Sequence, residues 1–184
     1  MSSTDRVFKL ITGGNGGIGK TAMLHKYVYG EFNKNTTVTI SLDFFIKNVS
    51  YSSTNFTLQM WDLGGEERFR FLHEKFIKGA HVGLLLFDLT RIVSLENIPY
   101  WARMFRSQDN ALPLVLVGTK HDLIEMKRYP EVQESLISEI AEKCKIKKEY
   151  CLKISSKTGF NVDKVFKLAS ELALEHLLKK KRII

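Results

Sequence analysis

The apolar residues of this chain recur in two ways, at the spacing of a strand in some segments and at that of a helix in others. Apolar residues at 6–12 predict a buried strand, and residues 20–30 predict a helix that ends at Gly30. Uninterrupted apolar runs, typical of strands covered on both faces, occur at residues 82–88 and 112–118. The remaining pattern predicts helices at 94–108, 131–144 and 162–180, and a short last strand at 150–154.

Two segments after the first predicted helix alternate apolar and polar residues. Residues 40–49 and 55–62 show this alternation, and a short polar stretch joins them. Together they predict an antiparallel hairpin. The alternation places Phe44 on the apolar face, so we expect it in the core, with Phe45 and Trp61 facing the other way.

Strands and helices that alternate along a chain are typical of a doubly wound α/β domain. The length of 184 residues fits one such domain, and a hydrophobic fraction of 44% excludes a mostly disordered chain. Ligands of this fold class bind at the carboxyl ends of the parallel strands. We therefore look for functional residues directly after the predicted strands.

The cellular compartment is indicated by what the chain lacks. No segment reaches the roughly eighteen apolar residues of a membrane span, and residues 1–6 lack the apolar start of a secretory signal. Two cysteines, Cys144 and Cys151, cannot form a disulfide framework, and the histidines show no metal-ligand spacing. We expect a cytoplasmic protein with reduced thiols.

The formal net charge of +8 is concentrated near the C-terminus. Residues 145–184 hold eleven Lys/Arg and four acids, which leaves residues 1–144 close to neutral. The chain ends in a basic cluster, Lys179, Lys180, Lys181 and Arg182. We expect a solvated helix end there, with weak contact to anionic membrane as the alternative. No nucleic-acid-binding module appears.

A glycine-rich segment joins the first predicted strand to the first predicted helix. It matches G-x-x-x-x-G-K-[ST] in full, and its residues are Gly14, Asn15, Gly16, Gly17, Ile18, Gly19, Lys20 and Thr21, with Ala22 following. Glycines let backbone N–H groups approach phosphate oxygens, and the start of the helix favours an anion. Lys20 would reach the β- and γ-phosphates, and the Thr21 hydroxyl would bind Mg²⁺.

Three further segments follow predicted strands and narrow the class of nucleotide-binding protein. Asp62 closes the strand at 55–62, and such an acid can hold Mg²⁺, while the N–H of Gly65 can meet a γ-phosphate. Asp122 follows the run at 112–118, and its carboxylate can accept two hydrogen bonds from guanine, which adenine cannot supply. Ser155, Ser156 and Lys157 follow the last strand.

In this order and spacing, the motifs resemble the Ras superfamily of small GTPases, over about residues 6–178. The segments 39–44, 61–69 and 78–80 look most like the Rab branch, and some short motifs are similar to those of the Spg1/Tem1 signalling GTPases. The resemblance implies a GTPase domain at 1–178 with a short basic tail at 179–184. It implies a six-stranded, mostly parallel sheet in the order 2-3-1-4-5-6, with strand 2 antiparallel and five helices.

The resemblance also implies roles for single residues. Thr39 would bind Mg²⁺ and the γ-phosphate, and Phe32 would lie edge-on to guanine. Lys120 would pack along the base that Asp122 reads, and the Ser156 N–H would meet the guanine oxygen. Effectors, exchange factors and activating proteins would bind through residues 33–45 and 61–78. The aromatic residues Phe44, Trp61 and Phe76 resemble the set that Rab proteins present to effectors.

Three positions depart from the family pattern. Glu66 stands where a glutamine usually positions the attacking water, and an ionised carboxylate only accepts hydrogen bonds, so we expect slow hydrolysis. Thr119 replaces the usual Asn of the base motif, as it does in the Rho branch. The last thirty residues hold no cysteine, so we expect no prenylation.

Two other functions share part of this pattern. A GTP-binding adaptor that does not hydrolyse GTP would keep the pocket, and Glu66 is its support in the sequence. A nucleotide kinase would share the phosphate loop but usually needs a lid with clustered arginines, and the sequence shows no such insertion. The sequence therefore favours a GTP/GDP switch that hydrolyses GTP slowly.

Overall fold

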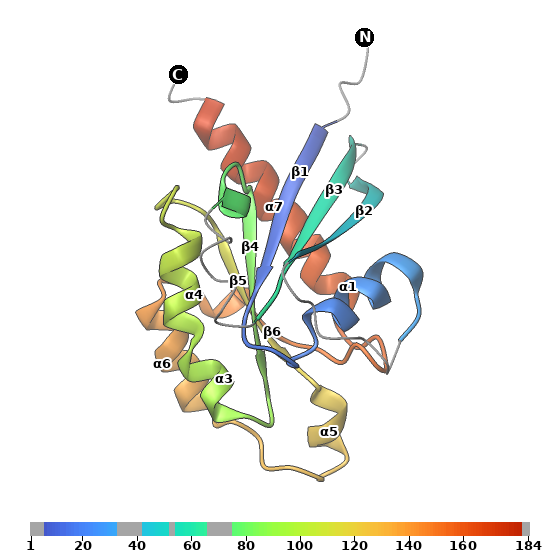
Figure 1. Ribbon diagram of the computed structural model, residues 1–184, viewed down its shortest axis with the longest axis vertical. Helices are drawn as coiled ribbons and strands as arrows, with labels where there is room; N and C mark the ends of the chain where they lie inside the picture. Colours follow the sequence, from blue (N-terminus) through green and yellow to red (C-terminus); the bar gives the residue numbers. More distant parts are fainter. Residues whose placement is uncertain (1–5, 33–41, 52–53, 66–74, 182–184) are drawn as a thin grey trace.

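The six predicted strands pair into one sheet in a computed structural model that describes residues 6–32, 42–51, 54–65 and 75–181. The sheet order is β2-β3-β1-β4-β5-β6 (Figure 1). The strands are β1 Arg6–Gly13, β2 Leu42–Tyr51, β3 Thr54–Leu63, β4 Val82–Asp88, β5 Leu114–Thr119 and β6 Cys151–Lys153. Only β2 is antiparallel to its neighbour in this sheet. The predicted α/β fold, its strand order and the hairpin are confirmed.

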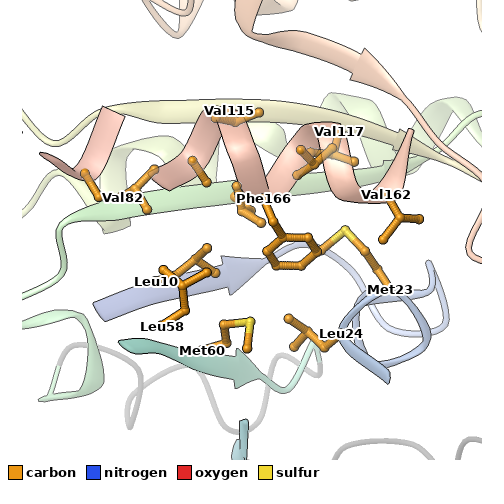
Figure 2. Close-up of a cluster of buried hydrophobic side chains, with 14 of the residues drawn as sticks. Leu10, Met23, Leu24, Leu58, Met60, Val82, Val115, Val117, Val162 and Phe166 are labelled. Carbon is orange, nitrogen blue, oxygen red and sulfur yellow. The ribbon is translucent and has the colours of Figure 1, made fainter. Parts of the chain in front are cut away.

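Helices cover both faces of the sheet, and each face has its own core. The described helices are α1 Lys20–Tyr29, α3 Ile92–Glu96, α4 Ile98–Phe105, α5 His121–Glu125, α6 Glu134–Lys143 and α7 Val162–Lys181, with a 3₁₀ turn at Lys148–Tyr150. On one face α7 and α1 meet over β1 and β3, where Phe166 lies beside Met23 (Figure 2). On the other face, α3, α4 and α6 bury Trp101 and Phe105 against the strands.

The second core needs two glycines in the sheet. A Cβ atom on Gly13 would lie 2.6 Å from both the Phe105 and the Trp101 rings, and one on Gly83 would lie 2.6 Å from Phe105. These distances are too short for a real contact, so the aromatic rings of α4 can pack directly on the backbone of β1 and β4 only because both positions lack a side chain.

The helix predicted at 94–108 forms as two helices, α3 and α4, joined at Asn97. Pro99 lies in the first turn of α4 and has no N–H to bond the carbonyl of Leu95, which a continuous helix would need. The five-residue helix α5 follows directly on β5, and it is too short for an apolar repeat to predict. The described residues thus form six helices where five were expected.

The prediction for the faces of β2 is wrong. Phe44 is 42% exposed, whereas Phe45 is 5% exposed and packs on His25 with ring centroids 5.2 Å apart. Phe44 and Trp61 are partners across the hairpin and lie on the same face, with ring centroids 5.1 Å apart. The prediction took the Phe45 face as exposed because that face also carries the polar residue Lys47. In the structure, Lys47 extends its aliphatic stem along this face, so that its Nζ lies 4.0 Å from the Tyr27 ring.

The C-terminal end of α7 is attached to the body of the protein. His176 Nε2 lies 2.9 Å from Asp109 Oδ2, and Lys180 Nζ lies 2.5 Å from the same oxygen. One member of the predicted basic cluster is thus paired with an acid, and Arg182 lies outside the described residues. Among the described helices, none is long and apolar enough to cross a membrane. Cys144 and Cys151 are free thiols.

Candidate functional site

The glycine-rich segment forms a loop at the carboxyl end of β1 and leads into α1. Gly17 and Gly19 have φ values of 69° and 99°, which favour glycine. A Cβ atom on Gly14 would lie 2.3 Å from the carbonyl oxygen of Leu86 in β4, so this position needs a glycine. The sequence motif therefore corresponds to a backbone that few other residues could adopt.

Lys20 is the first residue of α1, and its side chain reaches back to the backbone of this loop. It is 5% exposed, and its Nζ donates hydrogen bonds of 2.9 Å to the carbonyls of Gly14 and Asn15. Burial lowers the pKa of Lys20 from its ordinary value, and the charge of Asp62 works in the opposite direction. The loop thus holds a buried cation among backbone groups that suit an anion.

Asp62, near the end of β3, lies against the start of α1. Its Oδ2 accepts a 2.5 Å hydrogen bond from the Thr21 hydroxyl, and its Oδ1 accepts one of 2.9 Å from Thr12. The carboxylate is fully buried, and burial raises its pKa while Lys20 and the two hydroxyls oppose that shift. Hydroxyl and carboxylate oxygens are the ligands that Mg²⁺ prefers, so this pair fits the predicted metal.

Gly65 lies against the phosphate loop from the other side. A Cβ atom placed on it would lie 2.3 Å from the backbone nitrogen of Gly16 and 2.4 Å from the carbonyl carbon of Asn15. The absence of a side chain at 65 therefore lets the segment after β3 touch the loop directly. Of the other predicted switch residues, Thr39 and Glu66 lie outside the described residues.

A pocket of about 300 Å³ lies next to the loop. It is lined by Gly17, Ile18, Gly19, Ala22, Phe32, Thr119, Lys120, Asp122, Leu123, Ser156 and Lys157. These residues come from the phosphate loop, α1 and the segment after it, from β5 and α5, and from the segment after β6, so the structure brings together motifs that are far apart in the sequence. Leu123 is the lining residue that the sequence motifs did not single out.

The carboxylate of Asp122, which lines this pocket, is held in place by a neighbouring serine. Asp122 is 6% exposed, and its Oδ1 accepts a 2.7 Å hydrogen bond from the Ser155 hydroxyl. Ser155 Oγ also accepts a hydrogen bond of 3.1 Å from the Thr158 N–H. The side chain of Ser155 therefore fixes the orientation of the predicted base-reading carboxylate.

Thr119 uses its hydroxyl to tie strand ends to the loop. Its Oγ1 lies 2.6 Å from the carbonyl of Ile18 and 3.0 Å from that of Phe87, and the residue is 1% exposed. A hydroxyl has one proton and can serve one of these carbonyls at a time. The threonine thus joins β5, β4 and the phosphate loop at the position where the family usually has an asparagine.

The side chain of Lys120 reaches from this pocket to the phosphate loop. It has a φ of 63°, and its Nζ lies 3.1 Å from the carbonyl of Gly17 and 2.7 Å from Asp88 Oδ2. Asp88 ends β4, and Arg91 also contacts its carboxylate. Neither Asp88 nor Arg91 had a role predicted from the sequence.

Comparison with known proteins matches the chain to the Ras family over residues 9–175. Rab-30 of Homo sapiens is 34% identical over 167 residues, which cover 90% of this chain and 79% of the relative. The Ypt/Rab-type GTPase ypt7 of Schizosaccharomyces pombe is 32% identical over 177 residues, covering 93% and 84%. Rab-13 of Rattus norvegicus is 34% identical over 176 residues, covering 95% and 82%. The matched span includes the loop, the pocket and Asp62.

Proposed function

We propose that this chain, which belongs to the Ras family and is a Rab-like small GTPase, is a switch that binds GTP or GDP with Mg²⁺ and hydrolyses GTP slowly. The observation that carries the proposal is the pocket in which Asp122 lies next to the phosphate loop. A carboxylate in that place pairs with the two N–H groups of guanine, and adenine would leave it unpaired.

The residues at the loop suit the phosphates and the metal. Thr21 and Asp62 would hold Mg²⁺ with Thr39, and the ion would neutralise charge on the phosphate oxygens. Lys20 would stabilise the charge that develops on the β- and γ-phosphates, and Gly65 would offer its N–H to the γ-phosphate. Loss of that phosphate would release the residues at 33–42 and 64–78, which makes the chain a switch.

Guanine selectivity is tested first, by measuring the binding of labelled GTP against labelled ATP. We expect a clear preference for GTP and a dependence on added Mg²⁺. Equal affinity for the two nucleotides would contradict the role given to Asp122, and binding of ATP alone would favour a kinase.

Slow turnover rests on Glu66. Its negative charge would lie toward an anionic γ-phosphate, and it lacks the donor that glutamine supplies. In a single-turnover assay, we expect Glu66→Gln to raise the intrinsic hydrolysis rate by about a hundredfold, the lower end of the contribution of one positioned acid–base group. An unchanged rate would show that residue 66 does not face the reaction. No turnover in either protein would favour the adaptor function, in which GTP is bound and kept.

Partners would bind the switch segments and the aromatic residues beside them. Trp61 lies between Phe44 and Phe76, with ring centroids 5.1 and 5.8 Å away. Phe44 is 42% exposed and Ile46 is 53% exposed on the same strand face. This surface supports binding of effectors and regulators through residues 33–45 and 61–78. We propose a cytoplasmic location, with residues 179–182 as a solvated helix end and weak contact to anionic membranes as the alternative.

A further inference from the structure

Arg91 contacts the phosphate loop from outside the sequence motifs. It directly precedes α3, and its Nη2 donates a hydrogen bond of 3.1 Å to the carbonyl of Gly16. Its Nε lies 3.0 Å from Asp88 Oδ2. One guanidinium therefore joins a buried carboxylate at the end of β4 to the backbone of the loop, and this planar fork is a geometry that lysine does not have.

The carboxylate of Asp88, which Arg91 contacts, is itself held by several hydrogen bonds. It is fully buried, its Oδ2 lies 2.7 Å from Lys120 Nζ, and its Oδ1 accepts hydrogen bonds from the N–H and the hydroxyl of Thr90 at 2.9 and 2.7 Å. Burial alone would raise the pKa of Asp88, but the contacts from Lys120 and Thr90 outweigh it and hold the pKa below its ordinary value. The carboxylate is thus ionised at neutral pH and anchors two cations.

The two cations end on consecutive peptide groups. Arg91 bonds the carbonyl of Gly16, and Lys120 bonds the carbonyl of Gly17. In a trans peptide the C=O and the next N–H point in opposite directions within one plane. A donor that holds the Gly16 carbonyl therefore also sets the direction of the Gly17 N–H, and loop N–H groups are what would bind a phosphate.

We propose that Arg91 is a positioning residue for the phosphate loop: it pins the Gly16 carbonyl, directs the Gly17 N–H at bound phosphate and so slows nucleotide release. The inference rests on the proposed function, because it needs a nucleotide in the site. The charge of Arg91 also lowers the pKa of Lys20, so the guanidinium acts electrostatically at the same place. Arg91 is 47% exposed in its side chain, so its replacement should not disturb a core.

The test is the release rate of fluorescently labelled GDP, measured by displacement with excess unlabelled GDP in the presence of Mg²⁺. We expect Arg91→Ala to release it about tenfold faster, the effect of losing one charge-assisted hydrogen bond. Arg91→Lys should give a release rate between those of the wild type and Arg91→Ala, because an ammonium keeps the charge near Asp88 but lacks the planar fork of the guanidinium. Arg103→Ala, which removes an exposed arginine from α4, is the matched control and should not change the rate.

Hydrogen exchange separates positioning from general loosening of the fold. With GDP bound, Arg91→Ala should speed amide exchange in residues 14–21 and leave the core strands β4 and β5 unchanged. Faster exchange throughout would overturn the proposal, as would an unchanged release rate in Arg91→Ala or a wild-type rate in Arg91→Lys. If the wild-type protein does not bind labelled GDP, the proposed function fails and this inference fails with it. Tight binding with unchanged release from the variant overturns the inference alone.

Discussion

In the proposed function, Asp122 selects guanine over adenine. This role can be tested by replacing one carboxylate oxygen with nitrogen. Asp122→Asn puts an N–H₂ donor where guanine also presents donors, so we expect the affinity for GTP to fall by about a hundredfold. Equilibrium binding of labelled GTP measures it. Asp163→Asn, at an exposed position in α7, is the control for the lost charge and should bind as the wild type does.

Thr119 is a second single-residue test, this time of stability. Thr119→Val keeps the shape but leaves the buried carbonyls of Ile18 and Phe87 without this donor, so we expect a loss of about 1–3 kcal/mol in the free energy of unfolding. Urea unfolding measures it. Thr57→Val removes an exposed hydroxyl that bonds Asn48, and we expect less than about 0.5 kcal/mol there. Equal losses in the two variants would contradict the role given to Thr119.

At the residue scale, the sequence predicted the site where a motif ties residue type to position. The glycines, Lys20, Asp122 and Ser156 could be named because the chemistry of phosphate and guanine limits the choice of side chain there. Asp88 and Arg91 could not, because Arg91 contacts a loop residue 75 positions away and Asp88 acts through Arg91 and Lys120, an arrangement that depends on the approach of β4 to β1. Only the folded chain shows that pairing.

At the scale of elements, the order of strands and helices was predicted correctly, and their bounds and faces less well. Buried parallel strands such as β4 are uninterrupted apolar runs, so residues 82–88 were predicted as they form. The edge strand β2 has apolar residues on its exposed face, and a count of polarity alone could not tell that face from the core. The break between α3 and α4 needed the missing N–H of Pro99 to be considered.

The two faces of β2 can be separated by adjacent substitutions. Phe45 is 5% exposed, and Phe45→Ala should cost about 3–5 kcal/mol of unfolding free energy through the cavity that it leaves. Phe44 is 42% exposed, and Phe44→Ala should cost about 1 kcal/mol, the ring contact with Trp61. Denaturant unfolding of the two variants measures both values. The reverse order would mean that Phe44, and not Phe45, lies in the core.

For the whole molecule, His81 should make stability depend on pH. Its Nδ1 accepts a 3.0 Å hydrogen bond from the Lys9 N–H, which requires an unprotonated nitrogen. Burial lowers the pKa of His81, and the neighbouring positive charges of His176, Lys180 and Lys9 lower it further. The unfolded chain therefore takes up this proton first, and the stability present above about pH 6.5 declines as the pH falls toward the folded pKa.

Unfolding free energies between pH 7.5 and 5 measure this slope. His81→Gln keeps an acceptor for Lys9 without a titrating ring, so we expect a flatter profile over this range. A profile for His81→Gln that follows the wild type would contradict the assignment.

The attachment of α7 to Asp109 keeps the two ends of this helix a constant distance apart. The helix has 20 residues and rises by about 1.5 Å per residue, so its length is about 30 Å. It starts just after Ser156 and Lys157, which line the base pocket, and it ends at the opposite end of the molecule (Figure 1). Because Lys180 and His176 hold its far end, α7 works as a spacer of constant length. Whatever surface meets the far end of α7 is therefore kept about 30 Å from the first residue of the helix, Val162.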